Sequence, residues 1–333
     1  MSVTERDPVL VESGPTAPTG PGVPGEPELL LPREVPLGGP RAMLVQRSLP
    51  QRRRSLIGAW CFLDHYGPDD VSQRGMRVPG HPHTGLQTVT WLFEGEVEHR
   101  DTTGAVAVVR PGEMNLMTAG LGVAHSEYST PGTTRVHGAQ LWVALPDGAA
   151  TGNRAFEHYV PPLLRVAGAE VRVFLGEWLG ATGGPRTFTR LFGAEVVLRA
   201  GTEWRVPVDA RDEIGVLVDR GVVAVEGVTT RRSQLVALPP GRTELELRAE
   251  PGEDARVLVL GGEPFASPIV MWWNFVGRDH DDIVRARADW QRQVDAAKAG
   301  EPADGRFGPH PASWGGTVLP APELPTVRLK PRS

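Results

Sequence analysis

Two short stretches, His81-Pro82-His83 and His125-Ser126-Glu127, predict the fold of this chain. In each stretch two side chains of the kind that bind metals stand two residues apart, and in a β-strand residues at that spacing project from the same face. Strand-forming residues surround both stretches, so two neighbouring strands would bring three imidazoles and one carboxylate together. Because three nitrogens and one oxygen suit a divalent transition metal and exclude a thiolate site, we expect a single metal centre inside a β-barrel. The expected ligands are His81, His83, His125 and Glu127.

The bulk composition is typical of a soluble protein with two domains. The chain has 333 residues, of which 40% are hydrophobic and 23% are charged. Its formal net charge of -5 argues against nucleic acid or an anionic membrane as the main partner. The single cysteine, Cys61, lies in the apolar run 59–63, which predicts a buried, inert thiol and no intramolecular disulfide. Residues 1–39 lack the order of a secretory signal and no apolar run would span a bilayer, so we expect a cytoplasmic protein.

Short predicted strands fill two consecutive blocks of the chain. The first block, residues 41–165, contains the densest β pattern and both metal-binding stretches. The second block, residues 166–275, repeats this rhythm without any histidine or cysteine. Because the chain has no histidine between His158 and His280, the second block should not hold a similar metal site. We therefore expect an all-β protein with two tandem barrels, of which only the first carries a metal ion.

The two ends of the chain differ from these blocks. Residues 1–40 are rich in Pro, Gly and Glu and poor in large apolar groups, so we expect them to be disordered and about the first 35 to be dispensable for folding and metal binding. Residues 276–333 include Asp281-Asp282, an acidic pair suited to a helix N-terminus, followed by a helical stripe of apolar residues. We expect this helix to pack across one barrel and to be followed by an irregular tail.

Further motifs accompany the two metal-binding stretches. Seven segments carry motifs that occur together in one known protein family: 76–90, 95–101, 110–113, 117–120, 125–127, 140–146 and 261–265. As an ordered set they resemble the pirins, bicupin members of the cupin superfamily, and in particular the bacterial pirin-like quercetin 2,3-dioxygenases. The resemblance spans residues 41–287 and therefore covers both predicted barrels.

The resemblance implies two tandem cupin-type β-barrels and a C-terminal helix, with Fe(II) or another divalent transition metal bound by the four residues named above. It also implies cleavage of a flavonol such as quercetin, because open positions on the metal would accept both O₂ and a substrate oxygen. Glu127 would then be the catalytic residue and take a proton from the substrate hydroxyl. The alternative that the same resemblance implies is a non-catalytic, iron-dependent regulator that binds a transcription factor or a metabolic enzyme.

Four further polar residues bear on these alternatives. Gln87 stands where many pirins have Glu, which removes a possible proton relay or hydrogen-bond acceptor beside the metal. His65 stands next to the turn Gly67-Pro68, so we expect it to cap or to pack and not to bind metal. For His99 and His137, which lie near strand ends, we expect a structural or supporting role.

Overall fold

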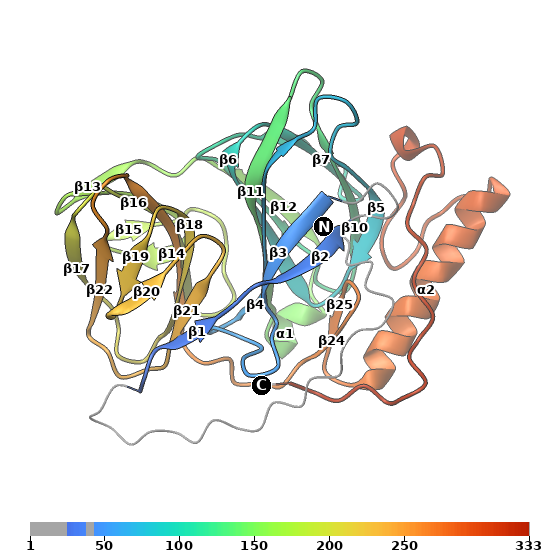
Figure 1. Ribbon diagram of the computed structural model, residues 1–333. Helices are drawn as coiled ribbons and strands as arrows, with labels where there is room; N and C mark the ends of the chain where they lie inside the picture. The colour runs from blue at the N-terminus through green and yellow to red at the C-terminus, as the bar shows by residue number, and fades with distance from the viewer. Residues whose placement is uncertain (1–24, 38–42, 333) are drawn as a thin grey trace.

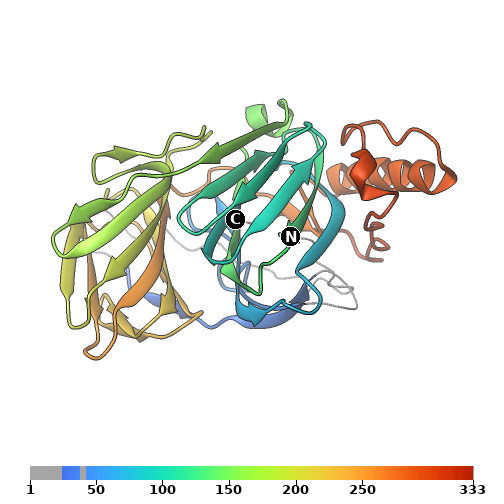
Figure 2. The ribbon, with the colours of Figure 1, turned by 90° about the horizontal axis from the view of Figure 1, so that it is seen from above.

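The computed structural model describes residues 25–37 and 43–332, and β-strands dominate this part of the chain. Two β-barrels lie side by side, and a long helix packs on the side of the first barrel that faces away from the second (Figures 1 and 2). The predicted fold class, mostly β with two barrels and a C-terminal helix, is confirmed.

The first barrel is built from two antiparallel sheets that face each other. Its larger sheet has seven strands in the order β12-β9-β6-β11-β4-β3-β2, and its smaller sheet has four in the order β5-β10-β7-β8. The strands of the larger sheet are β2 (Arg33–Leu37), β3 (Met43–Leu49), β4 (Trp60–Asp70), β6 (Leu86–Glu94), β9 (Met114–Thr118), β11 (Arg135–Ala144) and β12 (Ala155–Tyr159). Those of the smaller sheet are β5 (Arg77–His83), β7 (Val97–Asp101), β8 (Val106–Val109) and β10 (Val123–Ser129). The fold thus places both metal-binding stretches on the neighbouring strands β5 and β10.

The second barrel repeats this architecture with an apolar interior. Its larger sheet runs β1-β21-β18-β23-β16-β14-β13, with β15 paired to β14, and its smaller sheet runs β17-β22-β19-β20. The strands of the larger sheet are β1 (Glu28–Leu30), β13 (Leu164–Val166), β14 (Ala169–Trp178), β15 (Ala181–Thr182), β16 (Leu191–Leu198), β18 (Glu213–Arg220), β21 (Leu235–Leu238) and β23 (Ala255–Gly262). Those of the smaller sheet are β17 (Glu203–Pro207), β19 (Val223–Val225), β20 (Val228–Thr230) and β22 (Glu244–Ala249). Val and Leu side chains make up most of its hydrophobic core, and these offer no metal ligands.

A shared hydrophobic layer joins the two barrels. Trp91 of the first barrel stacks on Phe174 of the second with ring centroids 4.8 Å apart, and Trp60 lies edge-on to the same ring at 6.5 Å. The indole N–H of Trp60 donates to the carbonyl oxygen of Phe192 at 3.2 Å. Because these side chains are buried, the barrels meet as one packed unit and not as two loosely tethered domains.

Residues 28–37, which the composition predicted to be disordered, form two short strands instead. β1 pairs with β21 in the second barrel and β2 pairs with β3 in the first, so this segment belongs to both barrels. Composition missed these strands because each completes the edge of an existing sheet, where backbone pairing and one buried side chain, Leu30 or Val35, suffice. A deletion through residue 35 would remove β1, so we now expect it to destabilise the fold. Residues 1–24 and 38–40 of the predicted segment lie outside the described residues.

Helix α2 (His280–Ala299) has regular caps at both ends. Asp279 caps its N-terminus by accepting a hydrogen bond from a backbone N–H of the first turn, and Gly300 ends it in the left-handed conformation at φ 73°. Trp290 lies on its buried face, which packs against the first barrel as expected. The tail after the helix has little regular structure, but Phe307 and Trp314 are buried against the same barrel.

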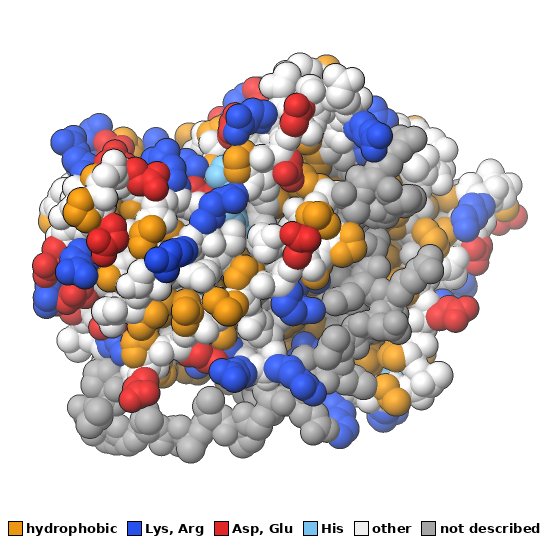
Figure 3. Space-filling model, viewed as in Figure 1, with side chains coloured by type: hydrophobic (Ala, Val, Ile, Leu, Met, Phe, Trp, Pro, Cys, Tyr) orange, Lys and Arg blue, Asp and Glu red, His pale blue; other side chains and the backbone are white. Residues whose placement is uncertain are grey.

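The other regular elements are short. They are α1 (Asp147–Ala150), β24 (Val270–Trp272), β25 (Phe275–Gly277) and the 3-10 helix η1 (Ala312–Trp314). None of the described helices is both long and apolar enough to cross a membrane. On the face seen in Figure 3, acidic and basic side chains are interspersed over both barrels, which is consistent with the modest net charge.

Candidate metal centre

Three histidines meet inside the first barrel, and we call them the metal cluster: His81 and His83 on β5 and His125 on β10. His81 and His125 are direct cross-strand partners. All three side chains are buried, with ring centroids 4.4 to 5.0 Å apart. One nitrogen of each ring lies within 4.8 Å of the others, and the Nε2 atoms of His83 and His125 are 3.1 Å apart. Local strand pairing therefore brings three of the four predicted ligands together.

Hydrogen bonds place the protons of two of these rings, His81 and His125, on the side away from the cluster. His81 Nδ1 lies 2.8 Å from the carbonyl oxygen of Pro79. Because a carbonyl oxygen can only accept, Nδ1 carries the proton and Nε2 has a free lone pair. This Nε2 atom is buried and has no hydrogen-bond partner in the described part of the chain. His83 lies near the backbone of Asn274, but its Nδ1 makes no hydrogen bond in the described part of the chain, so no hydrogen bond fixes the tautomer of this ring. Burial lowers the pKa of all three histidines well below the ordinary value, so the rings are in the neutral form that binds metals.

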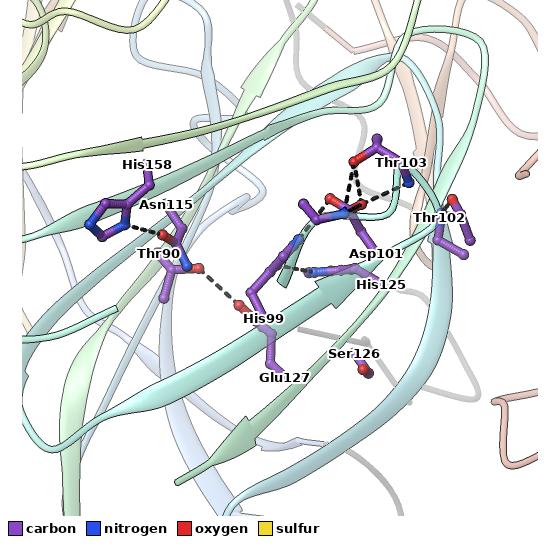
Figure 4. Close-up of polar contacts among 12 residues, drawn as sticks. Thr90, His99, Asp101, Thr102, Thr103, Asn115, His125, Ser126, Glu127 and His158 are labelled. Carbon is purple, nitrogen blue, oxygen red and sulfur yellow. Dashed lines mark hydrogen bonds and ion pairs between the residues drawn. The ribbon is translucent and has the colours of Figure 1, made fainter. Parts of the chain in front are cut away.

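His125 is held by a chain of hydrogen bonds that ends on a carboxylate (Figure 4). His99 Nε2 lies 2.9 Å from Asp101 Oδ2 and donates to it, which leaves His99 Nδ1 to accept. His125 Nδ1 lies 3.2 Å from that nitrogen, so His125 donates through Nδ1 and keeps the lone pair of Nε2 inside the cluster. Burial raises the pKa of Asp101, but the hydrogen bonds from His99 and Thr103 outweigh this and lower the pKa below its ordinary value. The ionised carboxylate thus fixes the tautomer of His125.

The Nε2 atoms of His81 and His125 therefore carry free lone pairs in a buried space that they share with Nε2 of His83. When His83 is in the tautomer that binds a metal through Nε2, two acceptor nitrogens lie 3.1 Å apart without a hydrogen bond, and a cation would relieve the repulsion between their lone pairs. A divalent ion bound to imidazoles at about 2.0 to 2.1 Å holds neighbouring ligand nitrogens about 3 Å apart, which is the separation of His83 and His125. The residues of the metal cluster thus fit a divalent transition metal.

Glu127, the fourth predicted ligand, joins the metal cluster through His125. One of its carboxylate oxygens lies within 4.8 Å of nitrogens of both His125 and His99. Its Oε1 accepts a hydrogen bond from the hydroxyl of Thr90 at 2.9 Å (Figure 4). Since this grouping includes neither His81 nor His83, the binding of one ion by all four residues stays a prediction.

A β-bulge in β5 lies just before the ligands, and the C-terminal tail supports it from outside. Glu127 pairs with Val78 whereas His125 pairs with His81, so two residues of β5 face Ser126. Trp314 donates its indole N–H to Ser126 Oγ at 2.8 Å. One of the two bulged residues is Gly80, where an added Cβ would lie 2.7 Å from the Trp314 ring. The composition of the tail gave no sign of this contact.

Gln87 does not lie beside the metal cluster, so its predicted effect on a proton relay there is wrong. Its Nε2 donates to the carbonyl oxygen of Arg186, in the second block of the chain, at 3.0 Å. On β6 it shares a face with Trp91, which packs against the second barrel, whereas Thr90 on the opposite face reaches Glu127. The sequence could not distinguish the two faces because β6 is buried on both.

Two further histidines lie between the barrels with a carboxylate of β18, and we call His65, His137 and Asp219 the interdomain cluster. Asp219 Oδ1 accepts from Nε2 of His65 at 2.8 Å and lies 2.6 Å from Nε2 of His137. Arg256 Nε donates to Asp219 Oδ2 at 2.6 Å, and His65 Nδ1 lies 2.8 Å from the hydroxyl of Ser233. His65 thus packs, as expected. The sequence missed its partner Asp219, which stands 154 residues later in the chain.

Two family models match this chain. The model named Pirin matches residues 42–143, and the model named Pirin C-terminal cupin domain matches residues 193–294. The first match contains all four predicted metal ligands and the second lies mostly in the second barrel.

Individual proteins are similar over most of their length. The Pseudomonas aeruginosa protein PA1205, whose name assigns it provisionally as a quercetin 2,3-dioxygenase, is 40% identical over 295 residues, or 88% of this chain and 89% of that protein. A pirin-like protein of Caulobacter vibrioides is 35% identical over 257 residues, or 74% of this chain and 88% of that protein. The crystal structure of a quercetin 2,3-dioxygenase from Acinetobacter baumannii matches with a TM-score of 0.82 and 38% identity, over 91% of this chain and 97% of that chain.

Proposed function

Because this chain belongs to the pirin family, we propose that it is an iron-dependent dioxygenase that cleaves a flavonol such as quercetin with O₂. Similar proteins from P. aeruginosa and A. baumannii carry quercetin 2,3-dioxygenase in their names. The observation that carries the proposal is the convergence of three neutral imidazoles in a buried site, where the Nε2 lone pairs of His81 and His125 face Nε2 of His83. A site of this kind is suited to a redox-active divalent metal.

The metal would be held by the Nε2 atoms of His81, His83 and His125, with Glu127 as the proposed fourth ligand. An Fe(II) ion at this place would supply Lewis acidity toward a chelating substrate oxygen and redox chemistry toward O₂. Because three neutral ligands and one carboxylate cannot cancel the charge of a divalent ion, the site favours an anionic substrate.

The chain's own residues would prepare both the site and the substrate. Glu127 takes the proton of the substrate hydroxyl, since one of its carboxylate oxygens lies within 4.8 Å of His125 of the metal cluster. Thr90 holds one oxygen of that carboxylate and so fixes its orientation. His99 and Asp101 keep the proton of His125 on Nδ1, which leaves Nε2 available to the metal.

O₂ uptake by protein loaded with Fe(II) in the absence of O₂, followed by quercetin, tests this proposal. We expect uptake by the wild type and its loss in Glu127→Gln, because an amide can bind the metal weakly but cannot take a proton. The matched control is His158→Ala, a half-exposed histidine of the same barrel outside the metal cluster, which should keep the activity. Iron-loaded wild type that takes up no more O₂ than His83→Ala would contradict the dioxygenase proposal and favour the non-catalytic regulator.

A further inference from the structure

The wall of the first barrel opposite the metal cluster is a regular grid of side chains. On β4, β11 and β6 the strand register aligns three rows of direct neighbours. The rows are Tyr66–Gly138–Leu92, Asp64–Gln140–Thr90 and Phe62–Trp142–Thr88. Thr90 reaches Glu127 at 2.9 Å, and the ring of Trp142 lies 5.1 Å from that of His83. The grid therefore faces the metal cluster across the barrel interior.

Trp142 carries a buried hydrogen-bond donor that no acceptor in the described chain satisfies. Its side chain is 1% exposed and is stacked on Phe62, yet its Nε1 has no partner. Six other tryptophans donate their indole N–H to an acceptor of the chain at 2.8 to 3.2 Å. They are Trp60, Trp91, Trp178, Trp204, Trp290 and Trp314. The indole N–H can only donate, so Trp142 is left with a donor for a group that the chain does not supply.

Tyr66 presents a second donor of the same kind. Its hydroxyl is buried and without a partner among the described residues. Burial raises its pKa well above the ordinary value, and the negative charges of Glu127 and Asp64 raise it further, so the phenol keeps its proton. Gly138 in the same row leaves the room for it, because a Cβ at this position would lie 2.8 Å from the Tyr66 hydroxyl.

Unpartnered buried donors are rare in folded proteins because each costs the free energy of a lost hydrogen bond. Two of them on one wall, both opposite the metal cluster, indicate a binding surface. Gln140 lies between them with its Nε2 also unpartnered, and its Oε1 is 3.0 Å from Thr90 Oγ1. Thr90 has only one hydroxyl hydrogen, and it donates this hydrogen to the carboxylate of Glu127. Either the oxygen or the nitrogen of the Gln140 amide can therefore face the Thr90 hydroxyl. The indole N–H of Trp142 can only donate, and the protonated hydroxyl of Tyr66 always has one hydrogen to donate, so these two groups are the firm donors of the wall.

We propose that Trp142 and Tyr66 bind the substrate by donating hydrogen bonds to different oxygens of a flat enolate or catecholate that chelates the metal. The chelating class rests on the proposed function, whereas the two donors rest on the geometry alone. Glu127 takes the proton from the substrate hydroxyl, and the oxygens of the resulting anion face an indole N–H and a phenol O–H on the opposite wall. Because both groups only need to donate, they favour ligands with an anionic or carbonyl oxygen over neutral amines.

Two measurements on Trp142→Phe and Tyr66→Phe test this inference. The first is the affinity of protein loaded with Co(II) for quercetin and for catechol, titrated by absorbance without O₂. We expect a loss of about 10- to 100-fold for each variant, the usual worth of one hydrogen bond to a charged group. The second is denaturant unfolding of the metal-free protein, where Tyr66→Phe should be as stable as the wild type or more stable, because it removes an unpaired buried hydroxyl.

Trp60→Phe is the matched control, because the Trp60 indole N–H is satisfied by the carbonyl oxygen of Phe192. It should lose stability and keep the affinity for both ligands. Tyr128→Phe, on the outer face of β10, should change neither. Should Trp142→Phe fold poorly, Tyr66→Phe still decides, since the change from Tyr to Phe keeps the ring.

The outcomes separate this inference from the proposed function. Wild type that binds quercetin but does not turn it over would end the dioxygenase proposal, yet weaker binding by both variants would still support the donors. If both variants keep the turnover and the affinity of the wild type, the role of Trp142 and Tyr66 in substrate binding is rejected, whereas the dioxygenase proposal is unaffected. Loss of stability in Tyr66→Phe without loss of affinity would also overturn the inference, and so would a metal-loaded wild type that binds neither quercetin nor catechol.

Discussion

The metal cluster and the interdomain cluster use the same parts in different positions. Both consist of buried imidazoles from strands of the first barrel, with a buried carboxylate nearby. In the interdomain cluster Asp219 lies between two rings and bonds to both. In the metal cluster Asp101 lies one ring further out, behind His99, and holds the proton of His125 away from the centre. The position of the carboxylate decides whether the imidazoles need a cation or hold two barrels together.

The electrostatics of Asp219 show how a carboxylate between two histidines is neutralised by its neighbours. Burial raises its pKa, but hydrogen bonds with His137 and His65 and the charge of Arg256 outweigh burial and hold the pKa well below its ordinary value. Its negative charge is therefore already matched by neighbours within the chain. The three rings of the metal cluster have no such group between them in the described chain, so this place is suited to a cation.

The largest effect on this comparison should come from Asp219→Ala. It leaves the ring of His65 buried and the part-buried guanidinium of Arg256 without their acceptor, which should lower the free energy of unfolding by about 3 kcal/mol. Metal content should stay unchanged, because the metal cluster lies on other strands. Denaturant unfolding and elemental analysis of one preparation measure both, with the exposed Asp295→Ala as control. If Asp219→Ala lost the metal and kept its stability, the interdomain cluster would be the metal site and would not stabilise the contact between the barrels.

The complementary change is His83→Ala. We expect metal affinity to fall by on the order of 100-fold or more, because even residues that only support a ligand are worth about 10- to 100-fold. His137→Ala should instead keep the affinity and lower stability. Competition with a chelator of known affinity measures both variants. Equal metal retention in the two would show that the clusters do not differ as described.

A smaller effect should follow from Asp101→Asn. The amide can donate to His99 Nε2, which would move the proton of His99 to Nδ1 and that of His125 to Nε2, where the metal should bind. We expect metal affinity to fall by about 10- to 100-fold with little change in stability. Asp70→Asn, an exposed aspartate of the same barrel, is the control for the same competition experiment. An unchanged affinity would mean that Asp101 does not set the tautomer of His125.

The smallest effect concerns pH. Burial lowers the pKa of His65 below its unfolded value despite the hydrogen bond to Asp219. Below about pH 6.5 His65 therefore binds a proton in the unfolded chain but stays neutral in the folded chain. As the pH falls, the free energy of unfolding falls by up to about 1.4 kcal/mol per pH unit. Asp219, with its depressed pKa, keeps its contribution throughout this window. Unfolding of metal-free protein between pH 7 and 5 should show a slope that His65→Asn reduces by this amount. An identical slope in both proteins would contradict the shift.

How much of the site could be predicted depends on the range of each interaction. The alternation of His81 with His83 is local to one strand, so the sequence alone indicated that both would share a face. The partnership of His65 with Asp219 joins strands of different barrels, and no local pattern marks it. The orientation of Gln87 failed for a third reason, because a strand buried on both faces carries no alternation to read.

The fold itself was predictable at the level of barrels, since their strands recur at short intervals with turn residues between them. The strands β1 and β2 were not, because their stability comes from the sheet edges they join and not from their own composition. The unpaired donors of Trp142 and Tyr66 were equally hidden, because a sequence does not reveal which polar atoms lack a partner.

The pairing of β1 with β21 also constrains the order of events during synthesis. Glu28 pairs with Ala237, so this strand leaves the ribosome long before its partner exists. At 5 to 20 residues per second the wait for some 200 further residues lasts roughly 10 to 40 seconds. During this interval β2 can already pair with β3, whereas β1 has no partner because β21 of the second barrel has not yet been synthesised. A ribosome stalled before residue 235 would hold a nascent chain that contains all the strands of the first barrel, while β1 still lacks its partner β21.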